Sequence, residues 1–216
     1  MADEDQKIIK QGVEVWNNWR KGNPSITPDL TEADLRGLKL QKIDLHQAIL
    51  KSAKFQLTNF YGANFEKAYL EKSKFQETVL VGANLKEANI TDANMLESNL
   101  QNADLENSDL QGAQFNEDTN FDGVNLKGAN LSWAILKSTS LRGSDLSHGK
   151  LIKVNLQNAD LSGANLRNSD LSGAYLRESN LTNADLSQAK FTGAITTNAV
   201  FCLTTMPDGT TNNSDC

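Results

Sequence analysis

The stretch Ala159–Asn168 reads ADLSGANLRN, two consecutive five-residue units that place a small residue, an Asp or Asn, and a Leu in the same order. The spacing continues in both directions. A Leu, Phe, Ile or Met occupies every fifth position over Leu30–Phe115, eighteen in all, and fifteen more over Phe121–Phe191 after a slip of one residue. A period of five fits neither a helical heptad nor strand alternation, so it predicts a repeat architecture.

Side chains of a strand alternate between its two faces, so a five-residue unit keeps every fifth residue inside only if the chain turns a corner in each unit. Four units then close a coil of about 20 residues, and coils stack at about 4.8 Å. This predicts an all-β solenoid with the large residue, and the small residue two before it, pointing inward. One corner recurs as Gly62, Gly82, Asn102, Gly123, Gly143, Gly163 and Asn183, which fits a turn requiring positive φ. Since the other corners lack this composition, we expect them to use a different turn from this one.

These units resemble the pentapeptide-repeat family, whose motif reads roughly Ala-Asp/Asn-Leu-x-x, over residues 28–201. The resemblance implies a right-handed quadrilateral β-helix of about nine coils, a rod of about 40 Å. Residues 1–27 are expected to form an N-terminal helical cap and linker, and residues 202–216 a C-terminal turn or loop cap. The predicted cap at one end and the tail motif Met206–Gly209 at the other resemble the cyanobacteria-rich branch of the family.

The N-terminal segment predicts one helix over residues 4–21 that ends at Gly22-Asn23-Pro24. Its apolar stripe consists of Ile9, Val13 and Trp16, with Ile8, Val15 and Trp19 beside it. A stacked coil has open strand edges, so this helix is expected to cover the first coil. A helix that binds a partner is the alternative.

The tail holds the two cysteines of the chain, Cys202 and Cys216, on either side of a Pro207-Asp208-Gly209 turn signal. A hairpin or loop folded over the last coil could bridge them, which would stabilise the fold by about 3 kcal/mol in the chain-entropy model. A reducing cytoplasm would keep them as thiols. Two cysteines supply neither a zinc site nor a disulfide framework, so no metal is expected.

Composition narrows the function further. The net charge of −6 and the pI of about 5.0 argue against direct binding to nucleic acid or an anionic membrane. No apolar run reaches the roughly 20 residues of a membrane-spanning helix, and the acidic start lacks a secretory signal, so we expect a cytoplasmic protein. His46 and His148 fall five coils apart, about 24 Å, and no catalytic motif is present. We therefore expect no enzymatic activity and no cofactor.

Two surfaces are candidate sites. Residues 87–126 contain nine acidic and no basic residues, and Glu77, Glu97 and Glu117 stack on successive coils. This ladder is either a solvated surface or an acidic docking site. The apolar residues Trp133, Ile135, Ile152 and Tyr175 occupy positions where the repeat predicts exposure, which makes them a candidate protein interface.

These features favour a non-enzymatic, rigid scaffold for an unidentified protein partner, with a monomer as the expected state. The family resemblance implies an alternative, a DNA-mimicking modulator of a type II topoisomerase such as gyrase. Duplex DNA carries one charge per about 1.7 Å, so a 40 Å mimic needs about two dozen negative charges. The chain has a net charge of −6 and a Lys-rich first third, which argues against mimicry.

Overall fold

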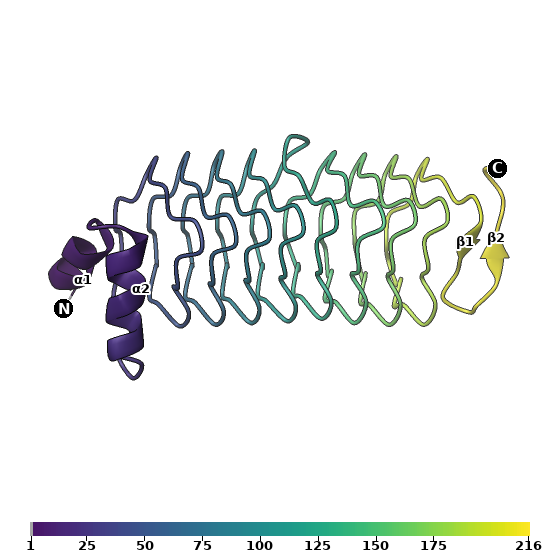
Figure 1. The fold of residues 1–216 in the computed structure, drawn as a ribbon. Coiled ribbons are helices and arrows are strands. Elements are labelled where there is room, and N and C mark those ends of the chain that lie inside the picture. Colours follow the sequence, from purple (N-terminus) through teal and green to yellow (C-terminus); the bar gives the residue numbers. More distant parts are fainter. Residues whose placement is uncertain (1) are drawn as a thin grey trace.

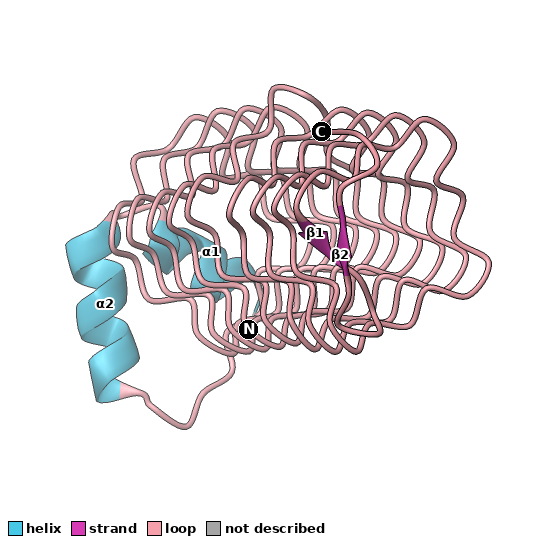
Figure 2. Ribbon diagram, turned by 90° about the vertical axis from the view of Figure 1, so that its right-hand side faces the viewer, coloured by secondary structure: helices cyan, strands magenta, loops and turns pink. Residues whose placement is uncertain are grey.

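The computed structural model describes residues 2–216 and forms an elongated rod (Figure 1). Two helices, α1 (Ala2–Ile9) and α2 (Val13–Gly22), lie at one end. A two-stranded antiparallel hairpin of β1 (Thr204–Thr205) and β2 (Thr211–Asn212) lies at the other. Between them the chain winds in stacked coils, which Figure 2 shows from the end of the rod.

The coils are joined by parallel β-bridges between residues twenty apart, such as Asp29–Ile49 and Ile49–Tyr69, or twenty-one apart across the inserted residue, as in Gln114–Ile135. These bridges form four columns, so each coil has four sides. We name the resulting faces of the rod after their first residues: the Asp29, Asp34, Lys39 and Asp44 faces. The Asp34 face, for example, runs through Lys54, Lys74, Asn94, Gln114, Ile135, Asn155, Tyr175 and Ile195. The segment is thus a four-sided solenoid held together by inter-coil hydrogen bonds.

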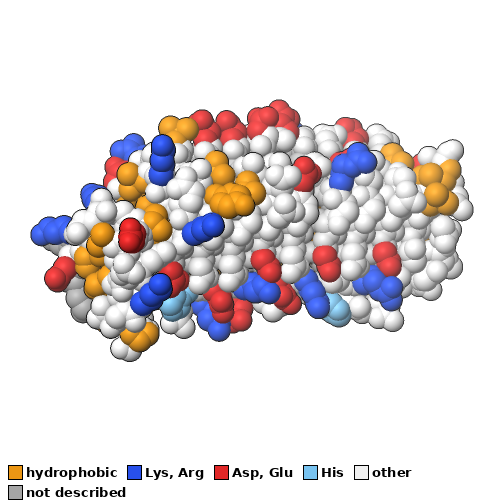
Figure 3. All heavy atoms as spheres, viewed as in Figure 1, with side chains coloured by type: hydrophobic (Ala, Val, Ile, Leu, Met, Phe, Trp, Pro, Cys, Tyr) orange, Lys and Arg blue, Asp and Glu red, His pale blue; other side chains and the backbone are white. Residues whose placement is uncertain are grey.

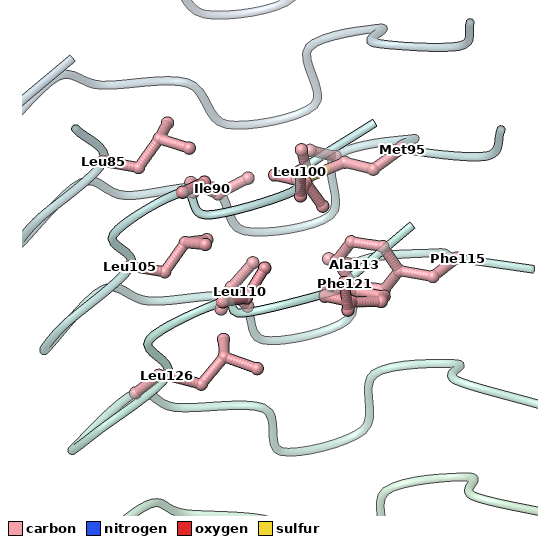
Figure 4. Close-up of a cluster of buried hydrophobic side chains, with 14 of the residues drawn as sticks. Leu85, Ile90, Met95, Leu100, Leu105, Leu110, Ala113, Phe115, Phe121 and Leu126 are labelled. Atoms are coloured by element: carbon pink, nitrogen blue, oxygen red, sulfur yellow. The ribbon is translucent and has the colours of Figure 1, made fainter. Parts of the chain in front are cut away.

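The core fills the inside of the rod with the large residue from the middle of each side. From Leu30 to Leu186 these residues are at most 2% exposed. Figure 4 shows Leu85, Leu105 and Leu126 stacked on one another through successive coils. Near the N-terminal end the column is aromatic, and the ring centroids of Phe55 and Phe75 lie 4.7 Å apart. Burial of a large apolar side chain contributes about 1.5–3 kcal/mol, so this repeated column dominates stability.

The expectation that one corner uses its own turn is wrong. With one exception, all four corners of the coils place a residue with positive φ at the same point, including Glu32, Lys42 and Leu57 as well as Gly62. A non-glycine residue in this conformation costs about 1–2 kcal/mol. The cost is offset by the ladder, since the N–H of the positive-φ residue donates to the next coil, as from Glu32 to the carbonyl of Lys51 (2.8 Å). Stacking therefore overrides the local preference for glycine.

Asp and Asn side chains before the central residues support these corners. The carboxamide oxygen of Asn64 accepts a hydrogen bond from the N–H of Glu66 (3.1 Å), and Asp160 does the same for Ser162 (3.0 Å). Each of these N–H groups lies outside the inter-coil ladder, so a short polar side chain two residues earlier satisfies it. The Asp and Asn of the repeat motif thus have a structural role.

The exceptional corner lies between Phe115 and Phe121, where one extra residue is inserted. No positive-φ residue occurs within it, and it forms the loop that projects from the upper edge of the rod in Figure 1. The N–H of Glu97 here bonds to the side-chain oxygen of Asn116 (2.9 Å), whereas its equivalent Glu77 bonds to the carbonyl of Leu96 (3.2 Å). The insertion is absorbed locally, because bridges on both sides of it continue in phase.

The prediction of one helix over residues 4–21 is wrong, because the segment forms two helices that meet at Gly12. Gly12 has a φ of 109°, which a helix cannot accommodate, so α1 and α2 can turn toward each other. Ile9 and Trp16 are fully buried against the solenoid, and Ile8, Val13 and Trp19 are partly buried there. Val15 is exposed, since the break changes the phase of the apolar stripe.

Side chains of the helical segment pair with the open edge of the first coil. The indole N–H of Trp16 donates to the carbonyl of Asp44 (2.7 Å), and the Asn17 side chain bonds both to the N–H of Asp44 (2.9 Å) and to the carbonyl of Lys42 (3.0 Å). Asp5 of α1 accepts from the N–H of Asp29 (2.9 Å). The helices therefore supply the partners that a preceding coil would have supplied on the Asp44 and Asp29 faces.

The tail covers part of the last coil. Strand β1 continues the Asp44 face, since Thr205 bridges Asp185, and β2 pairs with β1 across the turn at Asp208 and Gly209. Beyond the hairpin, the side chains of Asp215 and Asn213 accept the N–H groups of Phe201 (2.8 Å) and Leu203 (3.1 Å).

Candidate interaction surfaces

The surface of residues 2–216 has shallow hollows rather than an enclosed cavity. One of them has a volume of about 620 Å³ and lies on the Asp29 face, where its lining includes Ile49, Tyr69, Lys51 and Lys67. Both lysines are in ion pairs, Lys51 with Glu71 (3.1 Å) and Lys67 with Glu87 (3.7 Å). Within the described residues, no group of three or more His, Cys, Asp or Glu side chains is arranged to hold a metal ion.

Glu77, Glu97 and Glu117, which we call the acidic ridge, follow one corner of the rod between the Asp34 and Lys39 faces. All three are exposed, and acidic side chains gather along the upper edge of the rod in Figure 3. Glu77 and Glu97 occupy the positive-φ position of their corners, whereas Glu117 belongs to the six-residue loop and does not have a positive φ. The structure therefore places the three glutamates on one edge, with Glu117 in a backbone conformation that differs from that of Glu77 and Glu97.

Basic residues appear on this edge beyond the loop. The next corners carry Lys137 and, two coils further on, Arg177, both exposed. Neither takes part in an ion pair within the described residues. The acidic run of this edge thus ends at the loop, and beyond it the basic residues stand beside Glu178. A continuous acidic surface of DNA-like length is not built here.

Trp133, Ile135, Ile152 and Tyr175, which we call the Trp133 patch, lie together on and beside the Asp34 face. Trp133 is 54% exposed, Ile135 43% and Tyr175 40%, while Ile152 is partly buried. Ile135 and Tyr175 belong to one bridge column with Asn155 between them, and the N–H of Trp133 donates to the carbonyl of Ile152 (3.0 Å). The four residues span three successive coils, so their side chains form one surface rather than scattered exposures.

Two further residues belong to this surface but were not among the candidate residues from the sequence. The Nζ of Lys153 lies 4.4 Å from the centroid of the Trp133 ring, a cation–π contact between adjacent coils. Ile195 continues the bridge column beyond Tyr175. Both lie twenty residues beyond a member of the patch, so the repeat spacing applied to Trp133 and Tyr175 would have found them.

In the structure, Cys202 and Cys216 form a disulfide, with Cα atoms 4.8 Å apart. It joins the end of the last coil to the end of the chain and thereby holds Asn213 and Asp215 over the strand edge that they cover. The redox state of this pair in solution stays a prediction. The position of the bond indicates a structural role for it at the C-terminal end.

The buried basic residue Arg20 belongs to the N-terminal cap. Its guanidinium donates to the carbonyls of Ile26 (2.7 Å) and His46 (2.9 Å) and contacts the His46 ring, which in turn lies 2.8 Å from Asp44. Burial lowers the pKa of Arg20 from its ordinary value, and the charges of Asp44 and Asp5 oppose this shift. His46 is therefore part of the contact between cap and coil, far from His148 along the rod.

No helix among the described residues has the length and apolar character needed to cross a lipid bilayer. This finding rests on α1 and α2, which have eight and ten residues.

Comparison with protein families gives two matches. A model described as pentapeptide repeats, in eight copies, matches residues 29–66, 117–151 and 159–198, and a pentapeptide repeat region model matches residues 48–119. Together they cover most of the solenoid. Comparison with proteins of curated function gives no significant match.

Solved structures that resemble this chain include the following three, which differ in identity, coverage and TM-score. HetL, a pentapeptide repeat protein involved in regulation of heterocyst differentiation in the cyanobacterium Nostoc sp. PCC 7120, is 29% identical with a TM-score of 0.63, covering 90% of this chain and 98% of its own. A pentapeptide repeat protein of the Arabidopsis thaliana thylakoid lumen is 31% identical over 47% of this chain and 70% of its own, with a TM-score of 0.47. QnrB1, a plasmid-mediated fluoroquinolone resistance protein, is 20% identical over 79% of this chain and 86% of its own, with a TM-score of 0.48.

Proposed function

Because the chain belongs to the pentapeptide repeat family, we propose that it acts as a non-enzymatic scaffold, a rigid rod of about nine right-handed coils that binds a protein partner through a flat face. The observation that carries this proposal is the Trp133 patch, where an indole, a phenol and an isoleucine are each at least 40% exposed on one surface. Aromatic residues are enriched among those that dominate binding energy at protein interfaces.

The rest of the surface supports binding rather than catalysis. The hollows are open and lined by ion-paired residues, and the described residues bring no nucleophile, base and orienting group together in a cleft. HetL, which resembles this chain over almost its whole length, is described as involved in regulation. A regulatory role exerted through contacts with another protein fits these features.

The proposal is tested by affinity capture from an extract of the source cells with native protein and a Trp133→Ala, Ile135→Ser variant. A matched control, Tyr61→Ala, removes an aromatic side chain that is 50% exposed on a different surface. We expect a partner that is retained by native protein and by the control and is lost with the double variant. Equal capture by all three would contradict a role for the Trp133 patch.

The alternative, modulation of a type II topoisomerase by DNA mimicry, depends on the acidic ridge. The ridge covers three corners and is followed by Lys137 and Arg177, so it offers less than half the length of the rod to a DNA-binding cleft. We therefore expect no effect of micromolar protein on gyrase supercoiling. Inhibition, or protection from a quinolone, that is lost in Glu97→Lys would overturn the scaffold proposal in favour of this alternative.

A further inference from the structure

The Asp34 face has two unlike halves. Before the six-residue loop between Phe115 and Phe121 the face carries Lys54, Lys74, Asn94 and Gln114. Beyond this loop it carries Ile135, Asn155, Tyr175 and Ile195. The two corners that border this face are also divided. One runs from the acidic ridge to Lys137 and Arg177, and the other from Lys72 and Asp92 to Trp133 and Lys153. A surface with two unlike halves can match a copy of itself that runs in the opposite direction.

We propose that the partner of this face is a second copy of the chain, packed antiparallel about a two-fold axis that passes between the coils of Gln114 and Ile135. This inference rests on the proposed function, because it names the partner of the Trp133 patch. Each residue of one half then faces the residue at the same distance from the axis in the other copy.

The corner beside Trp133 shows how the halves match. Here Lys153 lies over the Trp133 ring (4.4 Å from Nζ to the centroid). Gly112 lies at the same corner one coil before Trp133, and the side chain of Asp92, from the coil before that, lies over Gly112. In the antiparallel pair Trp133 faces Gly112 of the second copy, over which the Asp92 carboxylate lies, and Lys153 faces Asp92. The basic pair of Lys153 and Trp133 thus meets the acidic pair of Asp92 and Gly112 in the second copy.

The opposite corner is complementary in charge. Glu117 lies opposite the corner of Lys137 in the second copy. Glu77 lies opposite Glu178, whose neighbour Arg177 offsets the like charge. On the face itself, Lys74 meets Tyr175 and Gln114 meets Ile135. By symmetry every contact occurs twice, so Lys153–Asp92 and Glu117–Lys137 give four opposite-charge contacts.

Other arrangements of the same face place like charges together. A parallel pair about an axis along the rod puts Lys54 and Lys74 against their own copies and Asp92 against Glu97. An antiparallel pair shifted by one coil can have its axis at the coil of Gln114, which puts Lys153 against Lys72. It can also have its axis at the coil of Ile135, which puts Lys137 against its own copy. Like charges at an interface disfavour wrong pairings, so the charge pattern selects one orientation and one position.

The matched strip runs from Lys54 to Ile195, about 35 Å at the spacing of stacked strands. It is one side of a coil wide, which is narrow for a permanent dimer. We therefore expect a reversible dimer whose dissociation constant is in the micromolar range and rises with salt.

The experiment is analytical ultracentrifugation of the full chain over a concentration series, with charge-reversal variants. Lys137→Glu and Glu117→Lys are each expected to raise the dimer Kd about tenfold or more, because each places like charges face to face twice. The double variant Glu117→Lys, Lys137→Glu restores opposite charges and is expected to return the Kd to within about threefold of native. The control Lys127→Glu reverses an exposed charge at the corner between the Asp44 and Asp29 faces, outside the proposed interface, and should leave the Kd unchanged.

Thermal unfolding of each variant separates loss of pairing from loss of fold. A native chain that stays monomeric at all concentrations, or a double variant that fails to recover, overturns the proposed dimer. If the native chain is monomeric while capture of another protein still depends on Trp133, the dimer fails and the scaffold function stands. If the charge swap restores a dimer but no other protein is captured, only the scaffold function toward other proteins fails.

Discussion

The side-chain oxygen of Asn116 accepts a hydrogen bond from the backbone N–H of Glu97 in the neighbouring coil, at 2.9 Å. This bond replaces the backbone bond found at the equivalent corner, where Glu77 donates to Leu96. Asn116→Ala should therefore lower the free energy of unfolding by about 1 kcal/mol, the usual net value of a hydrogen bond. Urea unfolding measures it. Gln114→Ala, an exposed neighbour, serves as the control and should change stability by less than about 0.5 kcal/mol.

The aromatic column near the N-terminal end predicts a large cost for truncation. Phe75 is fully buried, with ring contacts to Phe55 at 4.7 Å and to Phe65 at 6.3 Å. Phe75→Ala should lower the free energy of unfolding by about 3–5 kcal/mol, because the stacked coils above and below prevent collapse of the cavity. Lys74→Ala, exposed on the same coil, is the matched control. A loss below about 1 kcal/mol in Phe75→Ala would contradict a rigid core.

The positive φ of Leu57 predicts opposite effects of two substitutions. Leu57 has a φ of 62° and is 65% exposed, so its side chain contributes little packing. Leu57→Gly should keep or raise stability, by up to about 1 kcal/mol, because it removes the steric cost of this conformation. Leu57→Val should lower stability by about 1 kcal/mol, since a β-branched residue is least tolerated there. Equal thermal midpoints for both variants would show that the corner relaxes to another conformation.

The disulfide predicts a response to reductant. The bond closes a loop with a sequence separation of 14, which corresponds to about 3 kcal/mol in the chain-entropy model. Reduction of the native protein should lower Tm, and Cys202→Ser should show the lower Tm with no further response. A native protein whose Tm and free-thiol content are the same with and without reductant would not contain the bond in solution.

The ion pair at Asp34 predicts a local titration. Hydrogen bonds from the Arg36 guanidinium, at 2.6 and 2.8 Å, lower the pKa of Asp34 from 3.8 to about 2. Because the folded-state pKa is the lower one, this pair favours the folded state above about pH 4 and the effect is lost as pH falls through about 2. Carboxyl NMR shifts measure the titration. In Arg36→Ala the pKa should return toward 3.8, whereas Arg142→Ala should leave it unchanged.

The five-residue period was enough to predict the inward positions and the stacking of the solenoid, because every side of the coil repeats one simple pattern. Corners were predicted less well. A preference for glycine at Gly62 and its equivalents reflects local backbone energy, whereas Glu32 or Leu57 adopts the same conformation because the adjacent coil fixes it. The break of the helical segment at Gly12 was missed for a similar reason, since docking of Ile9 and Trp16 on the coil decides it.

The candidate surfaces show the same division. Spacing by twenty residues was enough to place Ile135 and Tyr175 on one face and the glutamates on one edge. The sequence did not reveal the contact of Lys153 with Trp133, because a side-chain conformation decides it. It also did not reveal that Glu117 lacks the backbone conformation of Glu77 and Glu97, because the extra residue of its corner changes the turn.

The six-residue loop between Phe115 and Phe121 has a practical consequence for protein engineering. The bridges before and after Asn116–Asn120 continue in phase although the chain has gained a residue there, so the scaffold already tolerates a change of length at this point. A foreign peptide grafted between Glu117 and Asp118 would be displayed outward from the middle of a stiff column. Its two ends would stay anchored in neighbouring sides of one coil. The corner is therefore a natural site for loop insertion in this protein.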